Sequence, residues 1–133
     1  MARKTLAWKI LAILCHAMIG WVAYATTMWG AMRLVPRTAA LIIHAVSAPI
    51  FFALVSWNYF TRFHFTSAVQ TAAFFALAVV ALDFFLVALL MHRSLAIFAS
   101  LLGTWIPCVL IFASTFLTGR WWEASTEQNA DNS

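Results

Sequence analysis

The chain has 133 residues, of which 65% are hydrophobic and only 9% are charged, and its formal net charge is +4 at pH 7. A soluble domain is about half apolar and about a quarter charged, and a chain of this size cannot hide so much additional apolar surface from water. The composition therefore excludes an ordinary soluble domain and predicts an integral membrane protein. The basic residues are thinly spread beside apolar segments and form no basic patch, so we expect no binding to nucleic acid.

Four apolar windows, each long enough to cross a bilayer as a helix, follow one another along the chain. They cover about residues 6–29, 38–59, 69–91 and 95–117. Helix is expected because a segment in lipid must satisfy its own backbone hydrogen bonds. The links are short, which predicts that successive helices are antiparallel neighbours. The predicted fold is an all-α integral membrane protein, a four-helix transmembrane bundle of up-down-up-down topology formed by residues 1–120.

The C-terminal tail and the distribution of basic residues bear on the topology. Residues 121–133 are mostly polar, and we predict a disordered tail there. If the N-terminus is inside, the cytoplasmic side receives more basic residues (Arg3, Lys4, Lys9, Arg62 and Arg120) than the outside (Arg33, Arg37 and Arg93). Because cytoplasmic loops carry the excess of Lys and Arg, we expect both termini in the cytoplasm and the protein in a plasma or inner membrane.

Asp83 lies inside the third window, where residues 72–91 include no other charged or polar side chain. A charge at the bilayer centre costs about 2.5–3.5 kcal/mol, so this carboxyl group is expected to face the protein interior and to have a partner there. At about 1.5 Å per residue, counted from the outer ends of the second and third windows, His44 and Asp83 differ in depth by only about 3 Å. A buried pair of His44 and Asp83 is therefore geometrically reasonable. Such a pair either fixes the register of the helices or handles a proton or a ligand, and the sequence leaves open whether the two side chains meet.

His16 completes the predicted intramembrane polar centre of Asp83, His44 and His16. Small residues stand one turn on either side of each histidine, which lets helices approach closely and favours histidines that point into helix contacts. His16 lies about 10 Å from the depth of His44. A metal ion or a haem shared by these side chains would need them at one height, so we expect neither a metal nor a cofactor.

Ser100, Thr104 and Cys108 recur at four-residue intervals in the fourth window and form a narrow polar stripe. Residues spaced in this way share one face of a helix, and we predict that they line a path. No metalloprotease, hydrolase or phosphate-loop motif occurs in the chain. The sequence therefore carries no catalytic motif that we can name, and a membrane enzyme or haem carrier ranks third, behind the two functions described next.

Two functions remain open from the sequence. In the first, the chain is a transporter or channel-type protein whose buried histidine–aspartate centre responds to protons or cations. In the second, it is a non-catalytic accessory or structural subunit that packs against a larger membrane complex, and the polar residues only specify helix pairing. The expected partners are the lipid bilayer and, because four helices enclose little volume, further copies of the chain or a larger complex.

Overall fold

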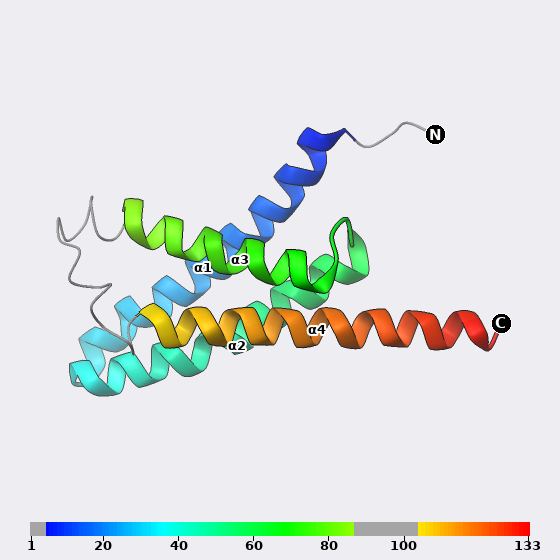
Figure 1. The fold of residues 1–133 in the computed structure, drawn as a ribbon. Coiled ribbons are helices and arrows are strands. Elements are labelled where there is room, and N and C mark those ends of the chain that lie inside the picture. The colour runs from blue at the N-terminus through cyan, green and yellow to red at the C-terminus, as the bar shows by residue number, and fades with distance from the viewer. Residues whose placement is uncertain (1–4, 87–103) are drawn as a thin grey trace.

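A computed structural model describes residues 5–86 and 104–133 of the chain. This part of the chain consists of four helices without a strand: α1 (Leu6–Leu34), α2 (Arg37–Arg62), α3 (Ala68–Leu82) and α4 (Ile106–Asp131) (Figure 1). The all-α bundle predicted from the sequence is confirmed. Residues 87–91 and 95–103 of the predicted third and fourth windows lie outside the described residues, and so does Ser100.

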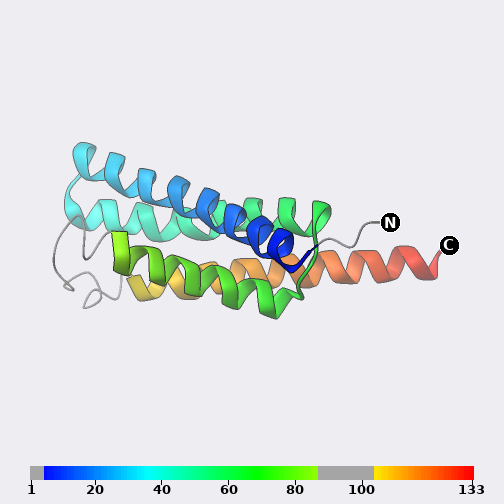
Figure 2. The same cartoon turned by 90° about the horizontal axis from the view of Figure 1, so that it is seen from above.

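The four helices run up-down-up-down, so that α1 begins and α4 ends at the same end of the bundle (Figures 1 and 2). We call this the chain-end side. Around the bundle, α1 packs beside α2, α2 beside α4, α4 beside α3, and α3, less extensively, beside α1. The prediction that all successive helices are neighbours is therefore wrong for α2 and α3, which lie across a diagonal. The reason is a close approach of α4: a Cβ atom added at Gly119 would lie 2.7 Å from side-chain atoms of both Phe60 on α2 and Ala68 on α3.

Local sequence explains where the helices begin. The hydroxyl of Thr5 accepts a hydrogen bond from the backbone N–H of Trp8 at 3.3 Å and caps α1. Ser67 and Gln70 form a capping box at the start of α3, in which each side chain accepts from the backbone N–H of the other. Such caps satisfy backbone donors that have no partner within the helix.

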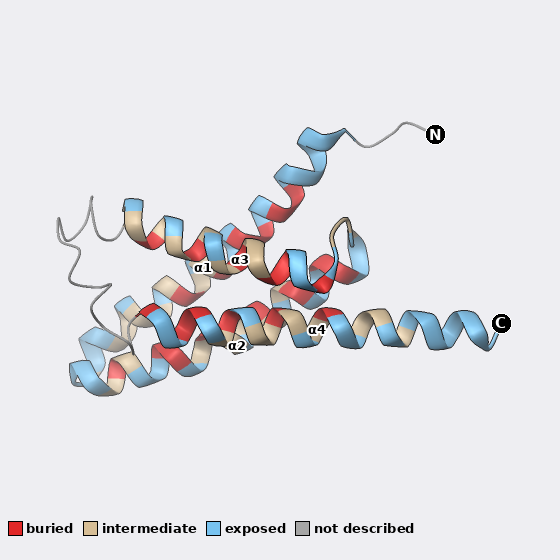
Figure 3. Ribbon diagram, viewed as in Figure 1, coloured by how far each residue is buried: buried red, intermediate tan, exposed pale blue. Residues whose placement is uncertain are grey.

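The outward faces of the helices are covered by large apolar side chains, whereas the buried positions form an interior stripe (Figure 3). In the part of the chain that the structure describes, three segments are long and apolar enough to cross a membrane: Leu6–Leu34, Arg37–Arg62 and Ala68–Leu86. Exposed apolar surface of this extent suits contact with lipid rather than with water. The core between the helices is built mainly of aromatic and aliphatic side chains, including Phe52, Tyr59, Phe60, Phe75, Val79 and Ile111.

Residues 121–131 are helical, in contrast to the disordered tail predicted from their polarity. The start of this stretch is tied to the bundle: Trp122 stacks on Phe60 and on His64, and Glu123 Oε1 accepts a hydrogen bond from the backbone N–H of Ala68 at 3.1 Å. Extending an existing helix adds one hydrogen bond per residue without a nucleation cost. The rest of α4 therefore continues as an exposed helix past the bundle (Figures 1 and 3).

Candidate functional site

Asp83 lies where α3 passes into a π-helical turn at residues 83–86, and its side chain is only 4% exposed. The indole Nε1 of Trp21 on α1 donates a hydrogen bond to Asp83 Oδ1 at 2.9 Å. The acid thus has a partner inside the protein, but that partner is not His44, the candidate from the sequence. No hydrogen bond or ion pair joins Asp83 to His44, because α3 lies beside α1 and across the diagonal from α2.

His44 stacks instead on Tyr24 of α1, with ring centroids 3.8 Å apart and ring planes at 29°. Both side chains are buried, yet within residues 5–86 and 104–133 the Tyr24 hydroxyl and the His44 Nδ1 have no hydrogen-bond partner. The Tyr24 carbonyl lies near the His44 ring but not in hydrogen-bond geometry with Nδ1. Buried polar atoms are nearly always paired in native proteins. Two unpaired atoms on adjacent rings therefore mark a place that can offer hydrogen bonds to a small polar species.

The charge of Asp83 influences Tyr24, one of the two stacked residues. A negative charge on the Asp83 carboxyl group would act through space on the Tyr24 phenol and on the Cys108 thiol of α4. The five residues Trp21, Tyr24, His44, Asp83 and Cys108, which we call the Asp83 cluster, thus draw on all four helices. Charges act over longer distances in a low-dielectric interior than in water. A change of charge on Asp83 therefore changes the electrostatic potential at the other groups of this cluster.

The polar stripe predicted for α4 does face the interior where the structure describes it. Thr104 is fully buried and Cys108 is nearly so. The same face continues through Ile111, Thr115 and Gly119, all of which are buried. Thr104 therefore lies one turn from Cys108 at the edge of the Asp83 cluster, while the proposed role of this stripe as a path lining stays a prediction.

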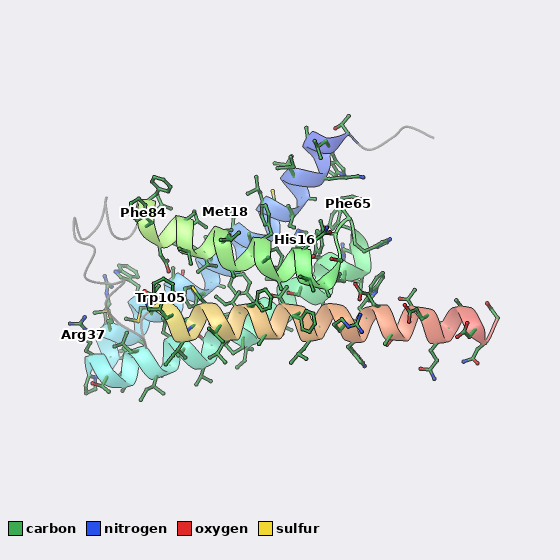
Figure 4. The ribbon with its side chains drawn as sticks, in the orientation of Figure 1. His16, Met18, Arg37, Phe65, Phe84 and Trp105 are labelled. Atoms are coloured by element: carbon green, nitrogen blue, oxygen red, sulfur yellow. The ribbon has the colours of Figure 1, made fainter. Side chains whose placement is uncertain are left out.

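His16, the third member of the predicted polar centre, lies elsewhere. Its Nδ1 is 2.7 Å from the Ala12 carbonyl oxygen, its Nε2 is 3.2 Å from Asn58 Oδ1, and the edges of Tyr59 and Phe63 pack against its ring. Asn58 lies about 21 Å along α2 from His44, at about 1.5 Å per residue. His16 thus lies toward Phe65, and Arg37, Phe84 and Trp105 lie at the opposite end of the bundle (Figure 4).

The contacts of His16 account for both of its ring nitrogens. Nδ1 must carry the hydrogen to donate to the Ala12 carbonyl, and Nε2 accepts a hydrogen bond when the Asn58 amide turns its nitrogen toward the ring. A satisfied histidine between two packed helices fixes how α1 and α2 pair. The structure therefore divides the predicted centre: Asp83 and His44 share one cluster through Tyr24, and His16 belongs to a separate helix contact.

Sequence reasoning missed Trp21 and Tyr24. A signal was present, because Trp21 falls inside an apolar window, whereas tryptophans in membrane proteins concentrate at the interfaces. A buried indole needs an acceptor for its N–H group. Tyr24 also continues the four-residue spacing of His16 and Gly20 on the buried face of α1.

A buried carboxyl group of this kind is a group that can take up and release a proton. Within the described ranges 5–86 and 104–133, no three His, Cys, Asp or Glu side chains are grouped so that they could hold a metal ion. Compared with known proteins, the chain matches no family model, no curated protein and no solved structure.

Proposed function

We propose that this chain is a small membrane protein of transporter or channel type in which the Asp83 cluster binds and releases a proton or a small cation. The observation that supports the proposal is a buried carboxyl group in one cluster with two buried polar atoms, neither of which has a hydrogen-bond partner among the described residues. A carboxylate can accept several hydrogen bonds, and among the described residues Asp83 accepts one side-chain hydrogen bond, from Trp21. The cluster thus has capacity left for a small polar ligand.

The position of the Trp21–Asp83 hydrogen bond supports a coupling of this binding to helix movement. The bond crosses from α1 to α3, the least extensive of the four contacts between adjacent helices. A proton or cation on Asp83 weakens the carboxylate as an acceptor, since hydrogen bonds to charged groups are about twice as strong as neutral ones. Loading the site therefore loosens α1 from α3, and release restores the contact.

The proposal is tested by proton flux into proteoliposomes that contain the purified full chain and an entrapped pH-sensitive dye, with a potassium diffusion potential as the driving force. Asp83→Asn should reduce the flux to that of liposomes without protein. Asp131→Asn is the matched control, because it makes the same chemical change at the exposed end of α4 and should leave the flux unchanged. A flux in Asp83→Asn equal to that of the wild type overturns the proposal. The same assay with sodium or potassium gradients separates a proton from a cation.

A second candidate function, an accessory subunit of a larger membrane complex, is supported by the extension of α4. This helix runs on as an exposed segment after Glu123 and offers a surface beyond the packed part of the bundle. Affinity purification in mild detergent tests this function with the full chain and with a chain that ends after Glu123. A stoichiometric partner that is lost on truncation supports the accessory role, and its absence from both preparations contradicts it.

The orientation and the assembly form part of the same proposal. We place the chain-end side in the cytoplasm and the protein in a plasma or inner membrane, and protease access to a C-terminal tag from each side checks this. A proton needs no open pore within one chain, whereas a larger solute would need a path between copies. The mass of the detergent-solubilised protein decides whether it forms a homo-oligomer.

A further inference from the structure

Each helix of the bundle carries the same order of inward-facing residues: a polar level, an apolar level and a second polar level. The apolar level consists of residues that stand between polar ones on their own helix: Gly20 between His16 and Tyr24, Phe52 between His44 and Ser56, Phe75 and Val79 between Thr71 and Asp83, and Ile111 between Cys108 and Thr115. We call Gly20, Phe52, Phe75, Val79 and Ile111 the apolar layer. It separates the Asp83 cluster from the chain-end side.

Phe52 is at the centre of this layer. Its ring packs against the backbone of α1 at Gly20, where an added Cβ would lie 2.8 Å from the ring atoms. The same ring meets Phe75 of α3 edge to face, with centroids 5.8 Å apart. Phe52, Phe75, Val79 and Ile111 are each 0% exposed and belong to one packed cluster. Protein interiors of this kind are close-packed with few voids as large as a water molecule, and apolar side chains offer an ion no hydrogen bond.

The polar level on the chain-end side of the layer differs from the Asp83 cluster, because its hydroxyl groups are paired. Ser56 donates to Thr115 at 3.1 Å, and the hydroxyls of Tyr59 and Thr66 lie 2.9 Å apart. The two polar levels are about 18 Å apart along α2, from His44 to Ser56, at about 1.5 Å per residue. A charged species that entered from the chain-end side would therefore have to cross the apolar layer to reach Asp83.

We infer that the apolar layer is the permeation barrier that isolates the Asp83 cluster from the chain-end side, and that the Phe52 ring seated on Gly20 closes it. This inference rests on the proposed function, since a barrier matters only if Asp83 exchanges a proton or a cation. Exchange with the chain-end side then requires α1 to move away from Phe52. The Trp21–Asp83 hydrogen bond lies next to Gly20 on α1, so loading of Asp83 acts on the helix that seats the ring.

The test uses Cys108 of the Asp83 cluster as a reporter of access. Cys15 is exposed on α1 and is first replaced by Ala, which leaves Cys108 as the one thiol. A charged, membrane-impermeant thiol reagent is then added from the chain-end side of oriented membranes that contain the full chain. With Phe52 intact, Cys108 should stay unmodified. Phe52→Ala should speed modification roughly tenfold or more, which corresponds to a barrier lowered by about 1.4 kcal/mol or more, and Phe52→Leu should lie between the two.

Phe112→Ala is the matched control, because it removes the same atoms from the partly exposed face of α4, one residue from Ile111. It should leave the labelling rate unchanged. Rapid modification of Cys108 with Phe52 intact overturns the inference. An equal labelling rate of Cys108 in Phe52→Ala and in the protein with Phe52 intact also overturns it. If Phe52→Ala fails to give a monodisperse helical protein, the Leu variant decides alone, since it retains most of the side-chain volume.

Labelling reports access and does not require transport. Suppose that the labelling rate of Cys108 depends on the size of residue 52, while Asp83→Asn leaves the proton flux unchanged. The apolar layer would then stand as a barrier, and the proposed function would be wrong. If Asp83→Asn instead abolishes the flux and the labelling rate of Cys108 does not depend on residue 52, the proposed function would stand and the inferred barrier would be wrong. The two proposals therefore fail separately.

Discussion

The indole N–H of Trp21 and the carboxyl oxygen of Asp83, 2.9 Å apart, join α1 to α3 in the interior of the bundle. These two residues are far apart in the sequence, and each is the kind of group that the bilayer interior tolerates only with a partner. Their meeting explains how the most apolar stretch of the chain holds an acid. It also gives the bundle a hydrogen bond whose strength depends on the charge of that acid.

Trp21→Phe should lower the free energy of unfolding, measured by titration with a denaturing detergent, because it removes the donor and keeps most of the packing. Hydrogen bonds to charged groups contribute about 1.5–3 kcal/mol, whereas those between neutral groups in membrane proteins average about 0.6 kcal/mol. We expect a loss in the higher range, which shrinks toward the lower value in an Asp83→Asn background. Trp8→Phe is the control, since Trp8 is 46% exposed on α1. Equal losses in the two backgrounds would show that the carboxylate charge does not strengthen the bond.

Tyr24→Phe and Tyr59→Phe form a matched pair, because both tyrosines are buried but, among the residues that the structure describes, only Tyr59 has a partner for its hydroxyl group, Thr66 at 2.9 Å. Removal of the paired hydroxyl of Tyr59 should cost about 0.5–1.5 kcal/mol of unfolding free energy. Removal of the unpaired hydroxyl of Tyr24 should leave stability unchanged or raise it by up to about 1 kcal/mol, while it lowers proton flux. A stability loss at Tyr24 as large as that at Tyr59 would show that its hydroxyl is engaged in the resting protein.

Gly119→Ala should destabilise the bundle by about 1–3 kcal/mol, as overpacking does in protein cores. The added methyl would lie 2.7 Å from Ala68 and from the Phe60 ring, and so would push α4 away from both α2 and α3. Gly30→Ala is the control, since nothing lies within 4 Å of its added Cβ. There the better helix propensity of Ala should stabilise α1 by about 0.5–1 kcal/mol. Detergent denaturation of both variants checks the sign, and a neutral Gly119→Ala would contradict the close packing of α4.

Glu123 provides the fourth test, because its carboxylate accepts the first backbone N–H of α3 from a different helix. Glu123→Ala should cost about 0.5–2 kcal/mol of unfolding free energy, the range for loss of a helix cap. Glu123→Gln keeps an acceptor oxygen and should cost less. Arg120→Ala serves as the control, since its pair with Glu123 at 3.4 Å is largely solvent-exposed and such pairs contribute about 0–1 kcal/mol. A larger loss of unfolding free energy in Arg120→Ala than in Glu123→Ala would contradict the capping role of Glu123.

Much of the fold could be predicted from the sequence. The apolar windows give α1 and α2 nearly at their observed bounds, and Asp83 is buried with a partner as the cost of a bare charge requires. Polarity alone predicts a disordered tail, but residues 121–131 are helical because Trp122 and Glu123 anchor the start of this stretch to the bundle.

The sequence by itself determined that the chain builds apolar helices and that its lone interior acid must face protein, because hydrophobicity and desolvation are properties of each segment. Only the tertiary structure decided which helices are neighbours. That choice depends on the fit of particular shapes, such as the Phe52 ring on Gly20 and the contact of Gly119 with Ala68, which no residue pattern along one helix contains. For this reason Asp83 meets Trp21 rather than His44, and His16 packs at the other end of the bundle with Asn58.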